Sequence, residues 1–364
     1  MTPEKFHSKL EASFPFIPTI SQINWFPEIS KFIFSKEKNN AFLLTGYAGT
    51  GKTTLIGSLV SQLKLTDYKA VLMAPTGRAA KVMSTYSKFS ARTIHKQIYY
   101  PKPETGGKMQ IKLKDNKSRN TIFIVDEASM IGDDRQNAKL FENGSLLHDV
   151  VQYVSTGDQC KLIFVGDPAQ LPPVHLNISP ALDLEELTQF HFDKVFSIQL
   201  DAVVRQAQGS GILHNATLLR NQLNNQLYDS FKFEVSDYKD ISYTNNGMDL
   251  FEAIEDSFRD SGTDQTVFIV RSNKRANIYN ENIRKRILGL EDDLSEGDQL
   301  MVVKNNYFWL APESKPGFIA NGDVIQIESI QMRKEIYGFS FAEVTVSLVD
   351  YPEEEFFDTV LLLK

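Results

Sequence analysis

The sequence has a single cysteine, Cys160, among its 364 residues. One cysteine cannot form a disulfide within the chain, so a disulfide framework of the kind found in small secreted proteins is excluded. The chain also lacks an apolar run near the roughly 20 residues that a membrane-spanning helix needs. Its start, Met1–Lys5, has no basic segment followed by an apolar stretch, as a secretory signal would have. We therefore expect a cytoplasmic protein that does not enter a membrane.

Positive charge is scarce over the chain as a whole. Lys and Arg number 39, Asp and Glu number 46, and the net charge is −7. A net acidic chain does not indicate nucleic-acid binding through its overall field, so any phosphate contact must come from a local basic groove. The hydrophobic fraction of 42% is enough for a substantial core and argues against wholesale disorder. The length suits two or three domains.

Short apolar runs alternate with segments of helical periodicity through the first half of the chain. Several runs are apolar at consecutive positions, as expected of parallel strands that are buried on both faces. Between the first two runs, the apolar residues of Thr53–Leu63 fall on one helical face. This alternation predicts an α/β fold, a parallel sheet with helices on both faces. The runs are Ala41–Thr45, Ala70–Met73, Thr121–Val125, Leu162–Val165 and Val195–Ile198.

The segment Tyr99–Asn120 interrupts this alternation. It contains prolines, a Gly-Gly pair and many lysines, and Met109–Leu113 alternates apolar and polar residues. We interpret it as a small β-hairpin inserted into the α/β domain. A second α/β unit is predicted to begin near Gln199, with a strand at Thr266–Val270 and a helix at Lys274–Ile287.

Beyond Ala311 the pattern changes to that of a small β module. Val324–Ile330 and Phe341–Val349 are predicted strands. A turn is predicted between them, at Lys334–Gly338.

One segment carries a complete phosphate-binding pattern. The run Gly46-Tyr47-Ala48-Gly49-Thr50-Gly51-Lys52-Thr53 fits G-x-x-x-x-G-K-[ST], follows a predicted strand and opens a predicted helix. Its glycines let backbone N–H groups turn inward around phosphates, and the helix N-terminus adds positive potential. Lys52 is predicted to reach the β- and γ-phosphates of ATP, and Thr53 to hold Mg²⁺. A glycine-rich turn that matches by chance is the alternative. The predicted nucleotide-binding residues of this loop are Gly46, Ala48, Gly49, Thr50, Gly51, Lys52, Thr53 and Thr54.

Two carboxylates follow the apolar strand Ile122–Val125. A P-loop ATPase needs one acid to hold Mg²⁺ and often a second to activate water. Asp126 fits the first role and Glu127 the second. Acids at strand ends are common as surface residues, so this pair indicates an ATPase only because it occurs together with the P-loop.

The segment Val165–Val174 ends another predicted strand. A Gly-Asp-Pro turn needs no function. Here it places Gln170 beyond the carboxyl end of a strand, where open α/β sheets bind ligands. Gln170 is predicted to sense the γ-phosphate or to position the attacking water.

Together, these segments resemble superfamily 1 DNA helicases, in particular the RecD-like and phage Dda-like 5′-to-3′ group. The most specific of them is Gly166–Val174, and the resemblance extends from about Thr19 to Asp323. It implies an ATP hydrolase that uses Mg·ATP to translocate on single-stranded DNA and to unwind duplex. The other matching segments are Ala74–Ala80, Thr93–His95, Asp126–Met130, Val203–Gln206, Gly297-Asp298 with Asn305-Asn306-Tyr307, and Asn321–Asp323.

The resemblance also implies roles for single residues. Arg205 would be the arginine finger that reaches the γ-phosphate, and Gln22 would read the adenine. Taken alone, Arg205 fits a surface arginine, Gln22 an exposed glutamine and His95 a structural histidine. The implied DNA-binding residues are Thr76, Gly77, Thr93, His95 and Asn273.

The hairpin Tyr99–Asn120 lies where these helicases insert a wedge that splits the duplex. Its lysines suit phosphate contacts, and a solvated loop is the alternative. The resemblance divides the chain into a first RecA-like motor domain (1–198), an incomplete second one (199–310) and a truncated SH3-like β module (311–364). The last motif of these helicases has no counterpart after Asp323, so we expect the chain to be a fragment.

The predicted function is therefore that of an ATP-dependent DNA helicase motor core. Its cofactors would be ATP and Mg²⁺, and its partners single-stranded DNA and duplex forks, with proteins of DNA repair or recombination. The motor is expected to act as a monomer. The alternative is a DNA-stimulated ATPase or translocase subunit of a recombination or repair nuclease complex, without unwinding of its own. A P-loop kinase or signalling NTPase is disfavoured by the segments Gly166–Val174 and Val203–Gln206.

Overall fold

The chain folds as two compact units. Unit 1 consists of Met1–Arg205, Gln299–Ser329 and Glu343–Val360, and unit 2 of Gln206–Asp298, Ile330–Ala342 and Leu361–Lys364. The computed structural model describes residues 1–103, 109–132, 145–190, 192–202, 209–225, 227, 230–263, 265–303, 306, 309, 310, 314, 319, 321–352 and 354–363. In these residues, no helix combines the length and the apolar character needed to cross a membrane.

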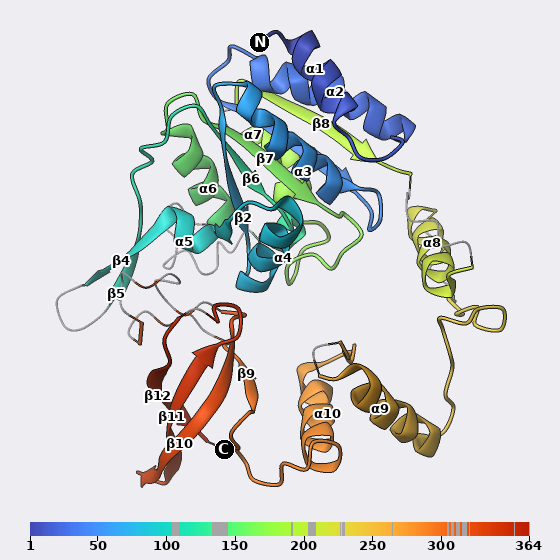
Figure 1. The fold of residues 1–364 in the computed structure, drawn as a ribbon, viewed down its shortest axis with the longest axis vertical. Coiled ribbons are helices and arrows are strands. Elements are labelled where there is room, and N and C mark those ends of the chain that lie inside the picture. Colours follow the sequence, from blue (N-terminus) through green and yellow to red (C-terminus); the bar gives the residue numbers. More distant parts are fainter. Residues whose placement is uncertain are drawn as a thin grey trace. The chain divides into compact units, whose positions relative to one another are not determined.

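Six strands form the sheet of unit 1, in the order β3-β2-β6-β7-β1-β8 (Figure 1). Every pairing in this sheet is parallel. The five strands predicted from the apolar runs are confirmed, whereas the three-residue strand β3 was not predicted. The strands are β1 (Asn40–Gly46), β2 (Lys69–Ala74), β3 (Ala91–Thr93), β6 (Thr121–Val125), β7 (Lys161–Gly166) and β8 (Lys194–Leu200).

Two hydrophobic cores lie on the opposite faces of this sheet. In β1, Phe42 and Leu44 belong to the first core and Leu43 to the second, because successive side chains of a strand point to opposite faces. Buried residues of α1 to α4 complete the first core, and those of α5 to α7 complete the second. The predicted α/β fold with helices on both faces is therefore confirmed. The helices are α1 (Pro3–Ala12), α2 (Ile20–Phe34), α3 (Lys52–Gln62), α4 (Gly77–Ser87), α5 (Ile94–Ile98), α6 (Leu146–Ser155) and α7 (Leu184–Gln189), with the short 3₁₀ turns η1 (Leu63–Leu65), η2 (Ala128–Met130) and η4 (Pro180–Leu182).

A lysine occupies a fully buried position at the start of β7. Lys161 has no exposed surface, and its Nζ donates to the carbonyl oxygens of Phe32 (2.7 Å), Ile33 (3.1 Å) and Ser35 (2.9 Å). The last carbonyls of a helix have no partner within the helix. The Lys161 ammonium therefore caps the carboxyl end of α2, where a cation also interacts favourably with the helix dipole.

The hairpin predicted within Tyr99–Asn120 is confirmed. Its strands pair antiparallel, with Tyr99 opposite Leu113. The base is held to unit 1, because Tyr99 is buried and Lys114 Nζ donates to the carbonyl of Lys96 at 2.6 Å. The strands are β4 (Tyr99–Pro103) and β5 (Met109–Leu113).

Unit 2 contains the helices α8 (Gly211–Asn224), α9 (Gly247–Ser261) and α10 (Asn273–Arg286). The helix α10 confirms the one predicted at Lys274–Ile287.

The strand predicted at Thr266–Val270 is wrong, because these described residues form no strand. Val267 and Ile269 are 75% and 94% exposed, whereas Phe268 between them stacks on Phe258 and Tyr279. The segment thus packs one partly buried side chain against α9 and α10, and no described strand pairs with its backbone.

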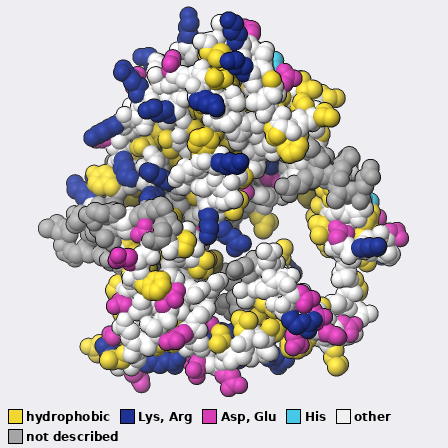
Figure 2. All heavy atoms as spheres, in the orientation of Figure 1, with side chains coloured by type: hydrophobic (Ala, Val, Ile, Leu, Met, Phe, Trp, Pro, Cys, Tyr) yellow, Lys and Arg dark blue, Asp and Glu magenta, His cyan; other side chains and the backbone are white. Residues whose placement is uncertain are grey.

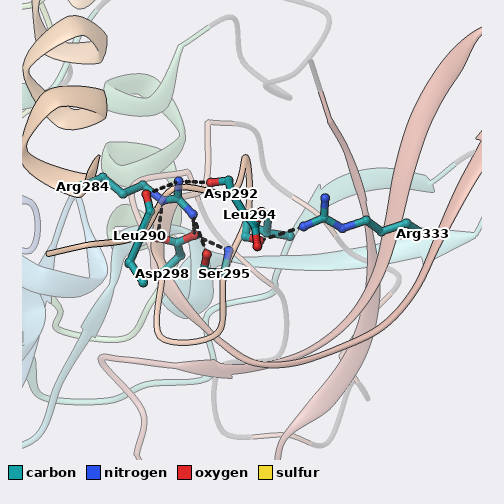
Figure 3. Close-up of polar contacts among 7 residues, drawn as sticks. All are labelled: Arg284, Leu290, Asp292, Leu294, Ser295, Asp298 and Arg333. Atoms are coloured by element: carbon teal, nitrogen blue, oxygen red, sulfur yellow. Dashed lines mark hydrogen bonds and ion pairs between the residues drawn. The ribbon is translucent and has the colours of Figure 1, made fainter. Parts of the chain in front are cut away.

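Arg284 of α10 closes the loop that follows the helix (Figure 3). Its guanidinium makes two hydrogen bonds to the Asp298 carboxylate, at 2.7 and 2.9 Å, and donates to Ser295 Oγ at 2.9 Å. It also donates to the carbonyls of Leu290 and Asp292. Asp298, a residue of the helicase-like segment Gly297-Asp298, therefore has a structural role within unit 2.

A four-stranded sheet has the order β12-β11-β10-β9 (Figure 1). The strands are β9 (Gln299–Met301), β10 (Val324–Ile336), β11 (Phe339–Leu348) and β12 (Phe357–Leu362). Both predicted strands are confirmed, but the turn predicted at Lys334–Gly338 is too long. Only Tyr337 and Gly338 form it, with φ of 54° and 79°. Two consecutive left-handed residues make the tight two-residue turn that fits the twist of a hairpin, so β10 continues to Ile336.

Candidate active site

The phosphate-binding loop lies between β1 and α3. Gly49 and Gly51 have φ of 79° and 86°, a left-handed conformation that glycine adopts without strain. A Cβ on Gly46 would lie 2.7 Å from Thr50 Oγ1 and 2.8 Å from Leu200 Cβ, so only glycine fits there. The loop therefore curves tightly into the amino end of α3, whose first N–H groups have no partner within the helix.

The Lys52 ammonium lies inside the curve of this loop. Its Nζ donates to the carbonyls of Gly46 at 2.6 Å and Tyr47 at 3.0 Å. Burial lowers the pKa of Lys52, and the nearby carboxylates of Asp167, Asp126 and Glu127 partly offset that effect. The loop thus presents a cation where the pattern predicts phosphate.

The Gln22 side chain supports the loop. It is 1% exposed, which contradicts the alternative of an exposed glutamine. Its Nε2 donates to the Thr50 carbonyl at 2.9 Å, and its Oε1 accepts from the Thr19 backbone N–H at 3.0 Å in the capping box of α2. The carboxamide is therefore engaged with the protein, and its predicted contact with adenine stays a prediction.

A cavity of about 660 Å³ lies beside the amino end of α2 and the carboxyl end of β8. Polar side chains, among them Asn24, contribute to its wall, and Gln22 does not. The sequence patterns did not indicate these residues. The lining residues are Thr19, Ile20, Ser21, Asn24, Ile198, Gln199, Asp201 and Ala202.

Asp126 and Glu127 follow the last residue of β6. The Asp126 backbone N–H donates to the Met73 carbonyl at 3.0 Å, which fixes the start of this segment beside β2. Asp126 Oδ1 accepts from the Glu127 backbone N–H at 2.9 Å, and Oδ2 accepts from the Tyr86 hydroxyl. Glu127 has a φ of 53°, so the chain turns sharply between the two carboxylates.

The surroundings of Glu127 raise the pKa of its carboxylate. Burial raises the pKa of Glu127, and the neighbouring Asp126 charge adds to this effect. A hydrogen bond with Gln170 and the charge of Lys52 act in the opposite direction. A carboxylate with a raised pKa accepts a proton from water more readily than an ordinary glutamate does.

Gln170 is placed beside these acids. Its Oε1 accepts from the Ser129 hydroxyl at 2.6 Å, and its side chain also bonds Glu127. Asp167 is buried, and its Oδ1 accepts from the Ala169 backbone N–H at 2.8 Å, which closes the turn that carries Gln170.

The structure thus brings together the predicted residues at the carboxyl ends of β1, β6 and β7, where parallel sheets bind ligands. These residues are Lys52, Thr53, Asp126, Glu127 and Gln170.

Two residues near these acids were not predicted. Ser129 lies within the helicase-like segment Asp126–Met130, but its bond to Gln170 depends on the fold. Tyr86 follows Met83, a buried residue of α4, by three positions and so shares its face. A tyrosine on a packed helix face needs a partner for its hydroxyl, which is the one signal the sequence offers. Burial and the Asp126 charge raise the pKa of Tyr86, so the phenol stays protonated and donates.

Thr53 and Asp126 fit a magnesium ion. They offer a hydroxyl and a carboxylate oxygen, and Mg²⁺ prefers such hard oxygen ligands. No group of three or more His, Cys, Asp or Glu side chains able to hold a metal occurs in the described part of the chain. Water and phosphate oxygens would supply the other ligands, as is usual for Mg²⁺ with nucleotides.

Two predicted DNA-binding threonines are helix caps. Thr76 Oγ1 accepts from the Ala79 N–H at 3.2 Å and begins α4, and Thr93 Oγ1 accepts from the Lys96 N–H at 3.2 Å and begins α5. The caps orient the amino ends of both helices, which attract anions. Contacts of Thr76 and Thr93 with DNA stay a prediction.

His95 lies one position inside α5. Its ring is 5.6 Å from that of Tyr99, whose hydroxyl donates to the buried Asp149 at 2.5 Å. Burial lowers the pKa of His95 to about 4, so its imidazole is neutral at pH 7.

The other two predicted residues lie elsewhere. Asn273 is the first residue of α10 in unit 2. Arg205 lies outside the described residues, together with the rest of Val203–Gln206.

Residues near the carboxyl end of unit 1 cover the amino end of α4. A Cβ on Gly77 would lie 2.7 Å from Asp323 Oδ1. Lys81 Nζ lies 3.6 Å from Asp350 Oδ1, and Lys96 Nζ lies 5.8 Å from the centre of the Tyr351 ring. Asp323, Asp350 and Tyr351 therefore lie over the segments predicted to face DNA, and we call these three residues the cover.

One stretch of the net acidic chain is strongly basic. Residues 64–119 contain 13 Lys and Arg but only three Asp and Glu, a net charge of +10. This stretch includes α4, α5 and the β4–β5 hairpin. Figure 2 shows Lys and Arg side chains spread over the visible face of the sheet-and-helix part of unit 1. The chain thus contains a local basic stretch of the kind that phosphate contacts would need.

Comparisons with known proteins extend over most of the chain. The profile of the AAA domain family matches residues 33–231. The chain is 25% identical over 343 residues to an uncharacterised protein of Acanthamoeba polyphaga mimivirus, covering 84% of this chain and 64% of that protein. It is 26% identical over 321 residues to the ATP-dependent DNA helicase Dda of Enterobacteria phage T4, covering 85% and 67%. It is 29% identical over 175 residues to the ATP-dependent RecD2 DNA helicase of Deinococcus radiodurans, covering 48% and 21%.

Among solved structures, a Pif1 helicase from Bacteroides in complex with ADP-AlF3 and ssDNA has a TM-score of 0.41 and 15% identity, covering 94% of this chain and 74% of that one. The phage T4 and Deinococcus relatives confirm the resemblance to Dda-like and RecD-like helicases that the motifs predict. The chain spans less than two thirds of the length of the mimivirus relative and about two thirds of that of the phage T4 helicase.

Proposed function

Because the chain belongs to the AAA domain family, whose profile matches more than half of its residues, we propose that it is the motor of an ATP-dependent DNA helicase. It hydrolyses Mg·ATP, translocates along single-stranded DNA in the 5′-to-3′ direction and separates the strands of a duplex. The observation that carries this proposal is the cluster of Lys52, Asp126, Glu127 and Gln170 around one phosphate-binding loop.

Each residue of the cluster has its own role in ATP hydrolysis. Lys52 turns from its loop carbonyls to the β- and γ-phosphates of ATP, and Thr53 and Asp126 hold Mg²⁺. When bound, Mg²⁺ neutralises charge on the phosphate oxygens. Glu127 accepts a proton from the attacking water, which its raised pKa favours. Gln170, held by Ser129, positions that water or senses the γ-phosphate.

A second motor domain supplies the remaining groups. In this proposal, residues 1–198 form the first motor domain, residues 199–310 belong to the second and residues 311–364 to a small β module. Arg205 reaches the γ-phosphate and couples closure of the cleft to the state of the nucleotide. Gln22 takes part in binding the adenine.

Single-stranded DNA binds over the basic stretch 64–119. The helix amino ends at Thr76-Gly77 and Thr93 contact phosphates, with His95 beside them and Asn273 from the second domain. Binding is independent of sequence and weakens as salt rises. The β4–β5 hairpin acts at the fork as the wedge between strands.

The test uses the full gene product and three variants. Lys52→Ala should abolish DNA-stimulated phosphate release, because the β- and γ-phosphates lose their cation. Glu127→Gln should keep Mg·ATP binding but hydrolyse ATP on the order of 10²–10⁴ times more slowly. Lys9→Ala, at an exposed lysine of α1 outside the basic stretch, is the matched control and should behave as the wild type.

Unwinding is measured on duplexes with a 5′ or a 3′ single-stranded tail. Only the 5′-tailed duplex should be separated. Wild-type turnover by Lys52→Ala would refute the proposed active site. Stimulated ATP hydrolysis without strand separation on either substrate would identify a translocase and refute the helicase assignment.

A further inference from the structure

Tyr86 links the two residues that fit a magnesium ion. Its hydroxyl donates to Asp126 Oδ2, and the Thr53 side chain lies beside the same phenol. Tyr86 thus bonds Asp126 and neighbours Thr53. None of the motifs that predict the active site contains Tyr86.

The position of Tyr86 suits cation binding. A hydroxyl that ligates a cation must point its proton elsewhere, and the neighbouring Tyr86 oxygen is an acceptor for the Thr53 proton. Asp126 is held at both oxygens, because Oδ1 accepts from the Glu127 backbone N–H at 2.9 Å and Oδ2 accepts from Tyr86. Each carboxylate oxygen has a second lone pair, so these bonds leave Asp126 able to bind Mg²⁺ or its water.

Tyr86 also connects this site to the DNA-facing side of unit 1. It is the tenth of the 11 residues of α4, and the helix begins at Gly77, behind the Thr76 cap. An α-helix rises about 1.5 Å per residue, so Tyr86 lies roughly 14 Å along a rigid rod from that end. A strand bound at Thr76-Gly77 would act on the same helix that carries the phenol.

We propose that Tyr86 is a positioning residue that orients Thr53 and Asp126 for Mg²⁺ and couples this orientation to single-stranded DNA at the amino end of α4. The inference rests on the proposed function, since it needs Mg·nucleotide at the P-loop and DNA at α4. Tyr86 touches the metal ligands and not the reacting atoms. Loss of the Tyr86 hydroxyl should therefore weaken metal-dependent nucleotide binding and should not act directly on the chemical step.

The test measures ADP binding by calorimetry, with Mg²⁺ and with EDTA, for the wild type and Tyr86→Phe. The variant keeps the ring and removes only the hydroxyl. Loss of such an outer partner typically costs about 10–100-fold in metal affinity. We expect the strengthening of ADP binding by Mg²⁺ to fall by about tenfold or more, while the affinity in EDTA stays unchanged. Tyr68→Phe is the matched control, because Tyr68 is also half-buried and packs against the same core.

The coupling between DNA binding and Mg·ADP affinity is measured by repeating the calorimetric titration in the presence of an oligothymidylate. Single-stranded DNA should change the Mg·ADP affinity of the wild type and should change that of Tyr86→Phe much less. An effect through packing alone would lower the melting temperature and weaken ADP binding equally in Mg²⁺ and EDTA, which would overturn the proposal. In an Asp126→Ala background, Tyr86→Phe should have no further effect on Mg²⁺ dependence, and a persisting effect would also overturn it.

The outcomes separate this inference from the proposed function. If the wild type shows Mg²⁺-dependent ADP binding and Tyr86→Phe matches it, Tyr86 has no positioning role and the helicase assignment stands. If the wild type shows no Mg²⁺-dependent nucleotide binding, the proposed function fails and this inference fails with it.

Discussion

Replacing the buried Lys161 by Met should make the stability of unit 1 less dependent on pH. Burial lowers the pKa of Lys161 to about 8 from its usual 10.5. Between these values the unfolded chain binds more protons than the folded chain does. The free energy of unfolding of the wild type therefore rises as the pH rises through this window. Met cannot titrate, so the variant lacks this contribution.

The magnitude follows from the two pKa values. A difference of 2.5 between them, evaluated from pH 7 to pH 10, corresponds to a gain of about 2–3 kcal/mol for the wild type over the variant. Lys161→Met also leaves the carbonyls of Phe32, Ile33 and Ser35 without their shared donor. Leaving buried acceptors unsatisfied costs about 1–3 kcal/mol each. The wild type should thus be more stable at pH 10, with the advantage shrinking toward pH 7.

The assay is equilibrium unfolding in urea, followed by tryptophan fluorescence. Trp25 is fully buried in α2, the helix whose carboxyl end Lys161 caps, and Trp309 is 42% exposed. A Trp309→Phe background leaves Trp25 as the reporter of unit 1. Lys194→Met, at an exposed lysine of β8, is the control and should follow the wild type at every pH. Parallel pH profiles for the wild type and Lys161→Met would refute the reasoning.

Replacing Gln22 by Ala removes the donor to the Thr50 carbonyl, so we expect the free energy of unfolding to fall by about 1 kcal/mol and ADP binding to weaken. An unchanged ADP affinity in calorimetry would show that the loop does not need this support. A short Gly-Ser turn in place of residues 101–112 should lower unwinding of 5′-tailed duplexes and leave DNA-stimulated ATP hydrolysis intact, because nothing then separates the fork. Equal unwinding would reduce the hairpin to an ordinary loop. Burial lowers the pKa of His95 to about 4 from 6.5, so the folded state binds fewer protons and stability should fall as the pH drops through this range. Urea titrations at pH 7 and pH 5 should show a smaller loss for His95→Gln, and an equal loss would contradict the assigned burial.

The sheet of unit 1 could be predicted because its strands are buried on both faces. Thr121–Val125 is apolar at nearly every position, and few other structures produce such a run. The same reasoning failed at Thr266–Val270, where the alternating pattern reflects one partly buried phenylalanine and two exposed side chains. A strand also needs a partner for its backbone, and the local sequence carries no information about that partner.

The candidate site was predictable where one segment supplies both the residue and its geometry. The P-loop and the strand-end pair Asp126-Glu127 are of this kind. Tyr86 and Lys161 are not, because their roles depend on segments about 30 to 130 residues away in sequence. The polar end of a tyrosine or lysine in an apolar context can find many different hydrogen-bond partners, and only the fold selects one of them.

The cover on the amino end of α4 has a consequence for synthesis of the chain. Lys81 Nζ contacts the carbonyl of Val349, which lies 268 positions later in the sequence. At the usual rate of about 5–20 residues per second, these covering residues leave the ribosome on the order of 10–50 seconds after α4 does. For most of that interval the basic stretch 64–119 has been made, and the covering acids Asp323 and Asp350 have not. The nascent chain is therefore far more attractive to polyanions, ribosomal RNA among them, than the finished protein is.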